Sequence, residues 1–273
     1  MFNKKSIAIA LGAALALGAS GAALATPVTV DGVTWDTANP LNFQINTLNM
    51  RETAVTATGQ TLTGYGQVGS INGNNNFCSG CDLTFTYTYT LSNITGNQVV
   101  FDKGSINFFV SNSPSSFNVQ QPDTATIGTP WLTLTGHTAP ATTFAAVGQL
   151  YGTIVGSLSN PTQGSNGFGY LDVSGGPAAT YLDMYQNVNP ITHAIGPGNF
   201  GFNSSFLFDG TNICGSLTSG GTSMCFPIGG TAELYGRLPK TVPEPGEIGL
   251  MGLGLGILGL FFWWRRKEGE TRA

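Results

Sequence analysis

The sequence is poor in charge. Its 273 residues include ten lysines and arginines, fourteen aspartates and glutamates, and two histidines. Between residues 26 and 241 the acidic side chains number ten. The basic side chains of that stretch are Arg51, Lys103, Arg237 and Lys240. Binding of DNA or RNA requires a cluster of cationic side chains. This composition disfavours it, and we expect no nucleic-acid partner.

The sequence also lacks the groupings of side chains that are typical of catalysis. His137 and His193 each lie near proline in a polar segment, without a neighbouring nucleophile motif. Glycoside hydrolysis needs a pair of carboxyl groups, and no sequence pattern brings Glu52 and Glu233 together. We therefore expect that this protein is not an enzyme and that it has no catalytic residue and no cofactor. A polysaccharide hydrolase ranks third among the candidate functions.

A metal site is not predicted either. Asp31, Asp36 and the turn at residues 209–212 carry oxygen atoms of the kind that Ca²⁺ prefers. Asp-Gly is, however, among the commonest turn sequences, so these residues are interpreted as turns.

Threonine, asparagine, serine and glycine supply most of the polarity, which suits a surface surrounded by polysaccharide. Between the turn residues, apolar and polar side chains alternate, which is typical of β-strands. The clearest case is residues 83–91, where leucine, phenylalanine and tyrosine occupy the odd positions and threonine the even ones. We expect Phe85, Tyr87 and Tyr89 to point into a core.

The whole pattern predicts an all-β fold, an antiparallel β-sandwich of jelly-roll type, in an ectodomain of residues 26–238. A division into two domains stays open. Residues 141–149 are the one segment with some helical character. The Asp31-Gly32 and Asp102-Lys103-Gly104 sequences predict hairpin turns. Strands are expected at 28–35, 41–46, 83–91, 99–101, 106–110, 131–135, 149–158, 168–173, 181–185, 202–208 and 232–238.

Four cysteines in an exported chain favour disulfides, and three pairings are possible. The candidates are Cys78, Cys81, Cys214 and Cys225. A turn centred on Ser219-Gly220 would place the last two opposite each other. The first two have the spacing of a redox motif, but a threonine-rich strand follows them instead of a helix. A zinc site with four thiolates also fits the spacing and is disfavoured by an oxidising compartment.

The N-terminus has the three parts of a secretory signal peptide, residues 1–25. Two lysines precede an apolar stretch of about a dozen residues, too short for a permanent membrane span. The small residues Ala23 and Ala25 then form a cleavage site, so we expect the mature chain to begin at Thr26.

An uncharged apolar run occupies residues 248–264. At 1.5 Å per residue a helix of this length spans roughly 25 Å, enough for a thin bilayer. It ends with two tryptophans, which prefer the membrane interface, and basic residues open the segment 265–273. We therefore predict a transmembrane helix with the N-terminus outside and the C-terminus in the cytoplasm. The membrane-orienting residues are Arg265, Arg266 and Lys267.

A proline-rich linker, residues 239–247, precedes this helix and contains Val242-Pro243-Glu244-Pro245. The order of this motif, an apolar helix and a short arginine cluster resembles the PEP-CTERM sorting signal of exported Gram-negative proteins. The resemblance covers the C-terminal tail only. It implies that an exosortase, a membrane-embedded cysteine transpeptidase, recognises the tail, cuts near the motif and releases the protein from the inner membrane.

Two alternatives remain for the tail. One is an ordinary single-span anchor that begins with Pro-Glu-Pro. The other is suggested by residues 238–241, which read like a sortase signal. That signal requires glycine next, and Val242 stands there instead.

We expect a non-enzymatic structural protein of the cell surface or of an extracellular, exopolysaccharide-rich biofilm matrix. A surface carbohydrate-binding module, with extracellular polysaccharide as its partner, is the alternative. An exposed cluster of aromatic rings would favour it. The rings in question are Trp131, Tyr170, Tyr181 and Tyr185.

Overall fold

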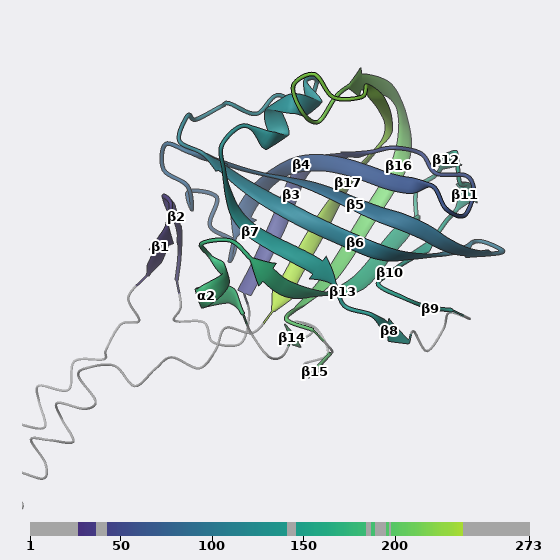
Figure 1. Ribbon diagram of the computed structural model, residues 1–273, viewed down its shortest axis with the longest axis horizontal. Helices are drawn as coiled ribbons and strands as arrows, with labels where there is room; N and C mark the ends of the chain where they lie inside the picture. The colour runs from purple at the N-terminus through teal and green to yellow at the C-terminus, as the bar shows by residue number, and fades with distance from the viewer. Residues whose placement is uncertain are drawn as a thin grey trace, which may run out of the picture. The chain divides into compact units, whose positions relative to one another are not determined.

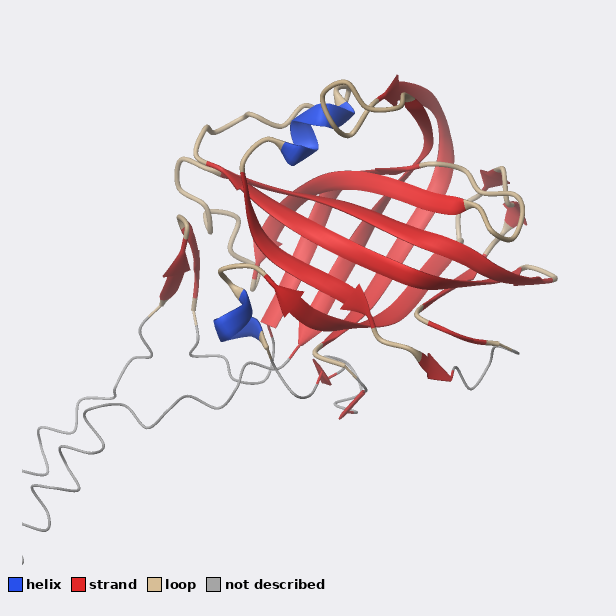
Figure 2. Cartoon of the chain, in the orientation of Figure 1, coloured by secondary structure: helices blue, strands red, loops and turns tan. Residues whose placement is uncertain are grey.

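The chain folds around one large antiparallel sheet (Figures 1 and 2). A computed structural model describes residues 27–36, 43–140, 146–183, 187–188, 195–196 and 198–236. The strands of the main sheet are β3 (Phe43–Glu52), β4 (Thr61–Ile71), β5 (Asp82–Thr95), β6 (Gln98–Ser111), β7 (Thr129–Gly136), β10 (Leu150–Thr153), β13 (Asn166–Gly175), β16 (Phe200–Gly215) and β17 (Met224–Gly236). The prediction of an antiparallel all-β fold is confirmed.

The sheet closes on itself. The strand order is β10-β13-β16-β17-β3-β4-β5-β6-β7, and two further pairings, β10 with β6 and β13 with β7, join its ends. In Figure 1, β3, β16 and β17 lie behind β4, β5 and β6 and cross them, as the layers of a sandwich do. The order is not that of a jelly roll, because neighbours in the sheet are also successive main strands of the chain. Successive main strands are therefore direct neighbours, without the crossovers that a jelly roll needs.

Two short strands share one position in the closed sheet. Strand β7 pairs with residues 105–110 of β6 and 171–175 of β13. Strand β10 pairs with residues 98–101 of β6 and 166–169 of β13. The two strands thus lie end to end between β6 and β13, and together they complete a ring of eight strand positions.

Smaller elements surround the sheet. The two-stranded ladders are β1 (Val28–Val30) with β2 (Val33–Trp35), β8 (Ala139–Pro140) with β9 (Val147–Gly148), β11 (Gly156–Ser157) with β12 (Asn160–Pro161), and β14 (Asn187–Val188) with β15 (Ile195–Gly196). The described ranges contain two short helices, η1 (Pro122–Thr126) and α2 (Ala179–Leu182). Among the residues described, no helix is long and apolar enough to cross a membrane.

Apolar side chains, which alternate with polar ones along the strands, fill the interior of the ring. Phe85, Tyr87 and Tyr89 are at most 7% exposed and belong to the main core, as predicted. At the end of the ring next to the β1–β2 hairpin, Trp35 makes edge-to-face contacts with Trp131, with ring centroids 5.9 Å apart. The Trp131 indole donates a hydrogen bond to the carbonyl of Val30, so the hairpin is fixed to the sheet there.

A second, smaller core lies beneath η1, apart from the main core. Tyr65, Phe226 and Ala125 are fully buried in it. The Tyr65 hydroxyl donates to the carbonyl of Val119, and the Thr84 hydroxyl donates to the carbonyl of Ala125. These contacts explain why Thr84 is buried, although the alternation predicts a polar face for it.

The cysteines form two disulfides, Cys78–Cys81 and Cys214–Cys225. Cys214 lies directly opposite Cys225 in the β16–β17 ladder. The amide of Gly221 bonds the carbonyl of Thr218, which confirms a turn centred on residues 219–220. The loop that carries Cys78 pairs with Val33, so the other bridge stabilises the place where the β1–β2 hairpin docks.

Strand β4 is not predicted from the sequence because glycines interrupt its alternation. Each of two glycines lies opposite an aromatic residue of β5: Gly64 opposite Tyr87, and Gly66 opposite Phe85. A Cβ on Gly64 would lie 2.2 Å from the Tyr87 ring. The two glycines therefore leave space for the aromatic side chains of β5. Each aromatic ring covers the part of β4 where the glycine has no side chain.

Three further local predictions are corrected by the structure. Residues 98–111 form one strand, β6, because Lys103 adopts a positive φ of 49° in a bulge instead of a hairpin turn. Tyr181 lies in helix α2 and not in a strand. In the segment 141–149, the described part contains strand β9, and residues 141–145 lie outside the described residues.

Candidate functional site: an apolar cavity around Glu52

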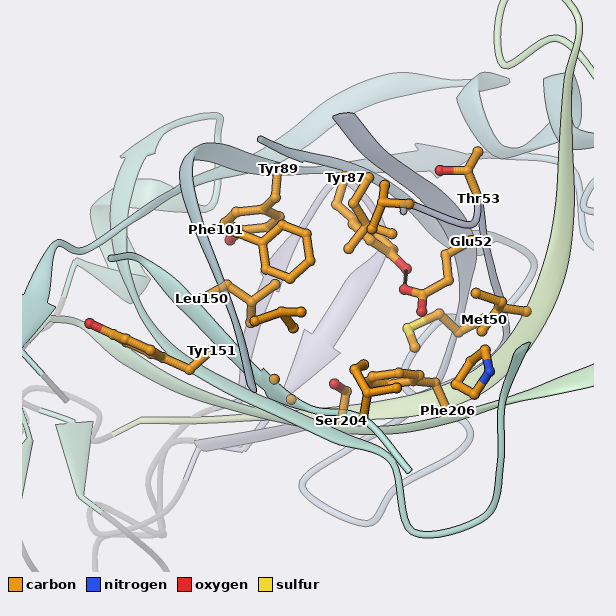
Figure 3. Close-up of a pocket in the computed structure, with 18 of the residues that line it drawn as sticks. Met50, Glu52, Thr53, Tyr87, Tyr89, Phe101, Leu150, Tyr151, Ser204 and Phe206 are labelled. Carbon is orange, nitrogen blue, oxygen red and sulfur yellow. Dashed lines mark hydrogen bonds between the residues drawn. The ribbon is translucent and has the colours of Figure 1, made fainter. Parts of the chain in front are cut away.

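The interior of the ring contains a cavity of about 50 Å³ (Figure 3). Closed sheets of eight strands have interiors that side chains fill or that hold one small ligand. The cavity lies toward the end of the ring where the β11–β12 connection contributes Leu158 and Pro161. Its other lining residues include Met50, Val55, Leu62, Tyr87, Tyr89, Val99, Phe101, Ile106, Leu150, Ile154, Phe202, Ser204, Phe206 and Ile228.

Glu52 is the one carboxyl group among these lining residues. A β-bulge explains its position. Between Leu48 and Arg51, β3 advances three residues while β4 advances two, and Asn49 takes a positive φ of 53°. The extra residue shifts the alternation, so that Met50 and Glu52 face inward and Leu48 is 51% exposed. Unbroken alternation from Phe43 would instead have buried Arg51.

Tyr87 is the hydrogen-bond partner of Glu52. Its hydroxyl donates to Glu52 Oε2 over 2.6 Å, and both side chains are buried. Burial raises the pKa of Glu52 from 4.5 to about 7, an effect that the bond from Tyr87 partly offsets. The pKa of Tyr87 is raised well above its ordinary value, chiefly by burial and also by the charge of Glu52. Near neutral pH, this carboxyl group can therefore either donate or accept a proton.

The second carboxyl oxygen of Glu52 points away from Tyr87 in Figure 3, toward the part of the cavity next to Met50 and Phe206. Among the described residues, no donor other than Tyr87 bonds this carboxyl group. One oxygen is thus held by the protein and the other faces the cavity.

The carboxyl pair considered for glycoside hydrolysis is not assembled. Glu52 lies opposite Ile228 in the ladder, whereas Glu233 lies opposite Asn46. Ile228 and Glu233 are five residues apart on β17, so the two glutamates are roughly 16 Å apart along the strand. This distance is well beyond the separation of the two carboxyl groups in glycosidases. Glu233 instead accepts a hydrogen bond of 2.6 Å from the Gln44 amide.

The remaining polar candidates lie apart from the cavity. His137 Nδ1 is 2.8 Å from the Asp172 carboxylate, and both side chains are partly exposed. Asp31 occupies the β1–β2 turn, and Asp209 forms an ion pair with Arg51. In the described ranges, no three His, Cys, Asp or Glu side chains gather as a metal site would require. His193 lies outside those ranges.

The aromatic rings considered for carbohydrate binding do not share one environment. Trp131 is fully buried, Tyr170 is partly buried, and Tyr181 is 46% exposed. Tyr185 lies outside the described residues.

The sorting and processing residues also lie outside the described part of the chain. This holds for the signal cleavage residues Ala23, Ala25 and Thr26, the motif Val242, Pro243, Glu244 and Pro245, and the basic residues Arg265, Arg266 and Lys267. No family model matches the sequence, and comparisons with curated proteins and with solved structures find no match.

Proposed function

We propose that the protein is exported and delivered to the cell surface or to an extracellular, exopolysaccharide-rich matrix, where it has a structural and non-enzymatic role. The observation that carries this proposal is the three-part C-terminal tail: the Pro-Glu-Pro motif, the apolar run of residues 248–264 and the basic cluster after it. The signal peptide at residues 1–25 supports it.

In this proposal the tail has separable roles. The motif around Glu244 is recognised by an exosortase, and the apolar run holds the precursor in the inner membrane. The charges that begin at Arg265 keep the C-terminus in the cytoplasm. Cleavage near the motif then releases the ectodomain.

Two features of the ectodomain agree with an extracellular setting. Both disulfides join cysteines within the described residues, and such bonds persist in oxidising compartments. The closed ring also leaves the main strands paired on both sides, so it presents little free edge to other proteins at high local concentration.

Between the structural role and carbohydrate binding, the burial of Trp131 favours the structural role. A tryptophan ring that is fully enclosed by Trp35 and Phe108 has no face to offer to a sugar.

Intact mass spectrometry of the protein recovered from the surface or matrix fraction tests the proposal. The expected species begins at Thr26, lacks residues 248–273 and is four hydrogen masses lighter than its reduced form. A surface form that retains Trp263 and Trp264 would show a plain membrane anchor and would refute processing by an exosortase.

A further inference from the structure

The cavity beside Glu52 is larger than a packing defect. Protein interiors contain few voids wider than one water molecule, because an empty space loses contact energy. A water needs roughly 10–15 Å³ of such space, and this cavity offers about 50 Å³. It therefore has room for roughly three to five water-sized groups.

The walls restrict what can occupy this space. Phe101, Ile106, Leu150 and Phe206 are among the apolar side chains that enclose it, so most of an occupant must be apolar. The charged exception is the second oxygen of Glu52, which faces the cavity while the first is held by Tyr87. Three side chains with hydroxyl groups, Thr53, Tyr89 and Ser204, also line the cavity. A buried carboxylate is costly unless its oxygens accept hydrogen bonds. An occupant that donates one hydrogen bond would lower this cost.

From this geometry we propose that the cavity is a binding site for a small apolar alcohol of about five non-hydrogen atoms, whose hydroxyl donates to the second oxygen of Glu52. A hydroxyl has one donor for the carboxyl oxygen that Tyr87 does not hold. An alkylammonium ion has three donors, more than this one oxygen accepts, and its charge is more costly to bury than a neutral hydroxyl. A ketone has no donor for a carboxylate. This inference does not depend on how the protein is exported.

The probes that distinguish these chemistries are 2-butanol and 2-butanone, which have the same size and differ in a hydroxyl and a carbonyl. We choose pH 8, where a carboxyl group with a pKa of about 7 is mostly ionised and can only accept. The readout is the ¹³C-methyl signal of methionine in the purified full chain. Met50 lines the cavity, and Met224, which packs in the core beneath η1, serves as an internal control.

In the unmodified protein, 2-butanol should shift the Met50 signal saturably and leave the Met224 signal in place. 2-Butanone should bind at least tenfold more weakly. 2-Aminobutane should also bind more weakly than the alcohol. Tighter binding of the amine or of the ketone would overturn the assignment of an alcohol.

Two neighbouring serines on β16 provide a matched pair of variants. Ser204 lines the cavity, whereas Ser205 is exposed on the other face of the strand. Ser204→Leu should fill the space and reduce alcohol affinity at least tenfold, and Ser205→Leu should change it less than twofold. Equal affinity in both variants would show that the alcohol binds elsewhere. Both variants contain the apolar run of residues 248–264, so nonspecific binding to that run would affect them equally.

Glu52→Gln tests the polar contact separately from the shape. The side-chain carbonyl of the substituted glutamine can accept the bond from Tyr87, which turns the amide N–H groups toward the cavity. The variant should therefore reverse the preference at pH 8 and bind 2-butanone more tightly than 2-butanol. An unchanged preference for the alcohol would refute the role of Glu52.

Discussion

Replacing Glu52 by glutamine should stabilise the protein at alkaline pH and have little effect at acidic pH. The pKa of Glu52 is raised from 4.5 to about 7 in the folded state. Below pH 4.5 the carboxyl group is protonated in both the folded and the unfolded chain, and burial of this neutral group adds no ionic cost. Between pH 4.5 and 7 the unfolded chain ionises first. The free energy of unfolding therefore falls as the pH rises through this window.

The size of the effect follows from the same two values. One pKa unit corresponds to about 1.4 kcal/mol, so the loss between pH 4.5 and 7 is about 3 kcal/mol. Glutamine has nearly the same shape and does not ionise. Its carbonyl can also accept the hydrogen bond that Tyr87 donates to Glu52. The difference in stability between variant and unmodified protein should thus be near zero at pH 4.5 and about 3 kcal/mol in favour of the variant at pH 8.

Urea unfolding of the purified full chain at intervals from pH 4.5 to 8.5 measures this difference directly. Subtracting the unfolding free energy of the unmodified protein from that of the variant at each pH removes the contributions of all carboxyl groups that the two proteins share. Tyr87→Phe provides a second test, because loss of the hydroxyl removes the one contact that lowers the pKa of Glu52 and should move the upper end of the window above pH 7. A difference between Glu52→Gln and the unmodified protein that is the same at pH 5 and pH 8 would refute the burial of an ionisable carboxyl group.

Three other predictions concern packing and sorting. Phe85→Ala should lower the unfolding free energy by roughly 3–5 kcal/mol and Thr86→Ala by less than about 1 kcal/mol, and equal losses in urea unfolding would contradict the alternation of β5. Gly104→Ala should cost about 1–3 kcal/mol because the new Cβ would lie 1.7 Å from a buried tyrosine ring, whereas Gly175→Ala, with open space around it, should cost under about 0.5 kcal/mol. Glu244→Ala should leave the uncleaved protein in the inner membrane in a strain with an exosortase; efficient release to the surface in cell fractionation would rule out recognition of the motif.

Most strands were predictable because their alternation is local. Residues 83–91 specify a core face and a polar face without reference to any other segment, and the Asp31-Gly32 hairpin follows from two residues that accept positive φ, 51° and 87°. The Cys214–Cys225 bridge was likewise predictable from a short turn.

The features that escaped prediction depend on partners distant in sequence. Strand β4 reads as a glycine-rich loop until Tyr87 is placed opposite Gly64. The inward position of Glu52 requires the bulge at Asn49, which reverses the alternation that begins at Phe43. An asparagine in a strand, followed by a change in the parity of the apolar positions, was the signal for this bulge. Closure of the sheet depends on pairings between β6, β7, β10 and β13 that no local pattern encodes.

The closed order of strands has a consequence for when folding can finish. Strands β3 and β17 are the first and last main strands of the chain, and they pair with each other. A chain that enters its folding compartment N-terminus first therefore exposes the unpaired side of β3 until residues 224–236 arrive. Contacts over such a separation form slowly, because loop closure must precede them. During that interval Phe43 and Ile45, which pack in the finished core, lie along an open edge. The chain at this stage is most vulnerable to proteases and to pairing with other strands, and a variant that slows the arrival of β17 should aggregate even though its finished fold is unchanged.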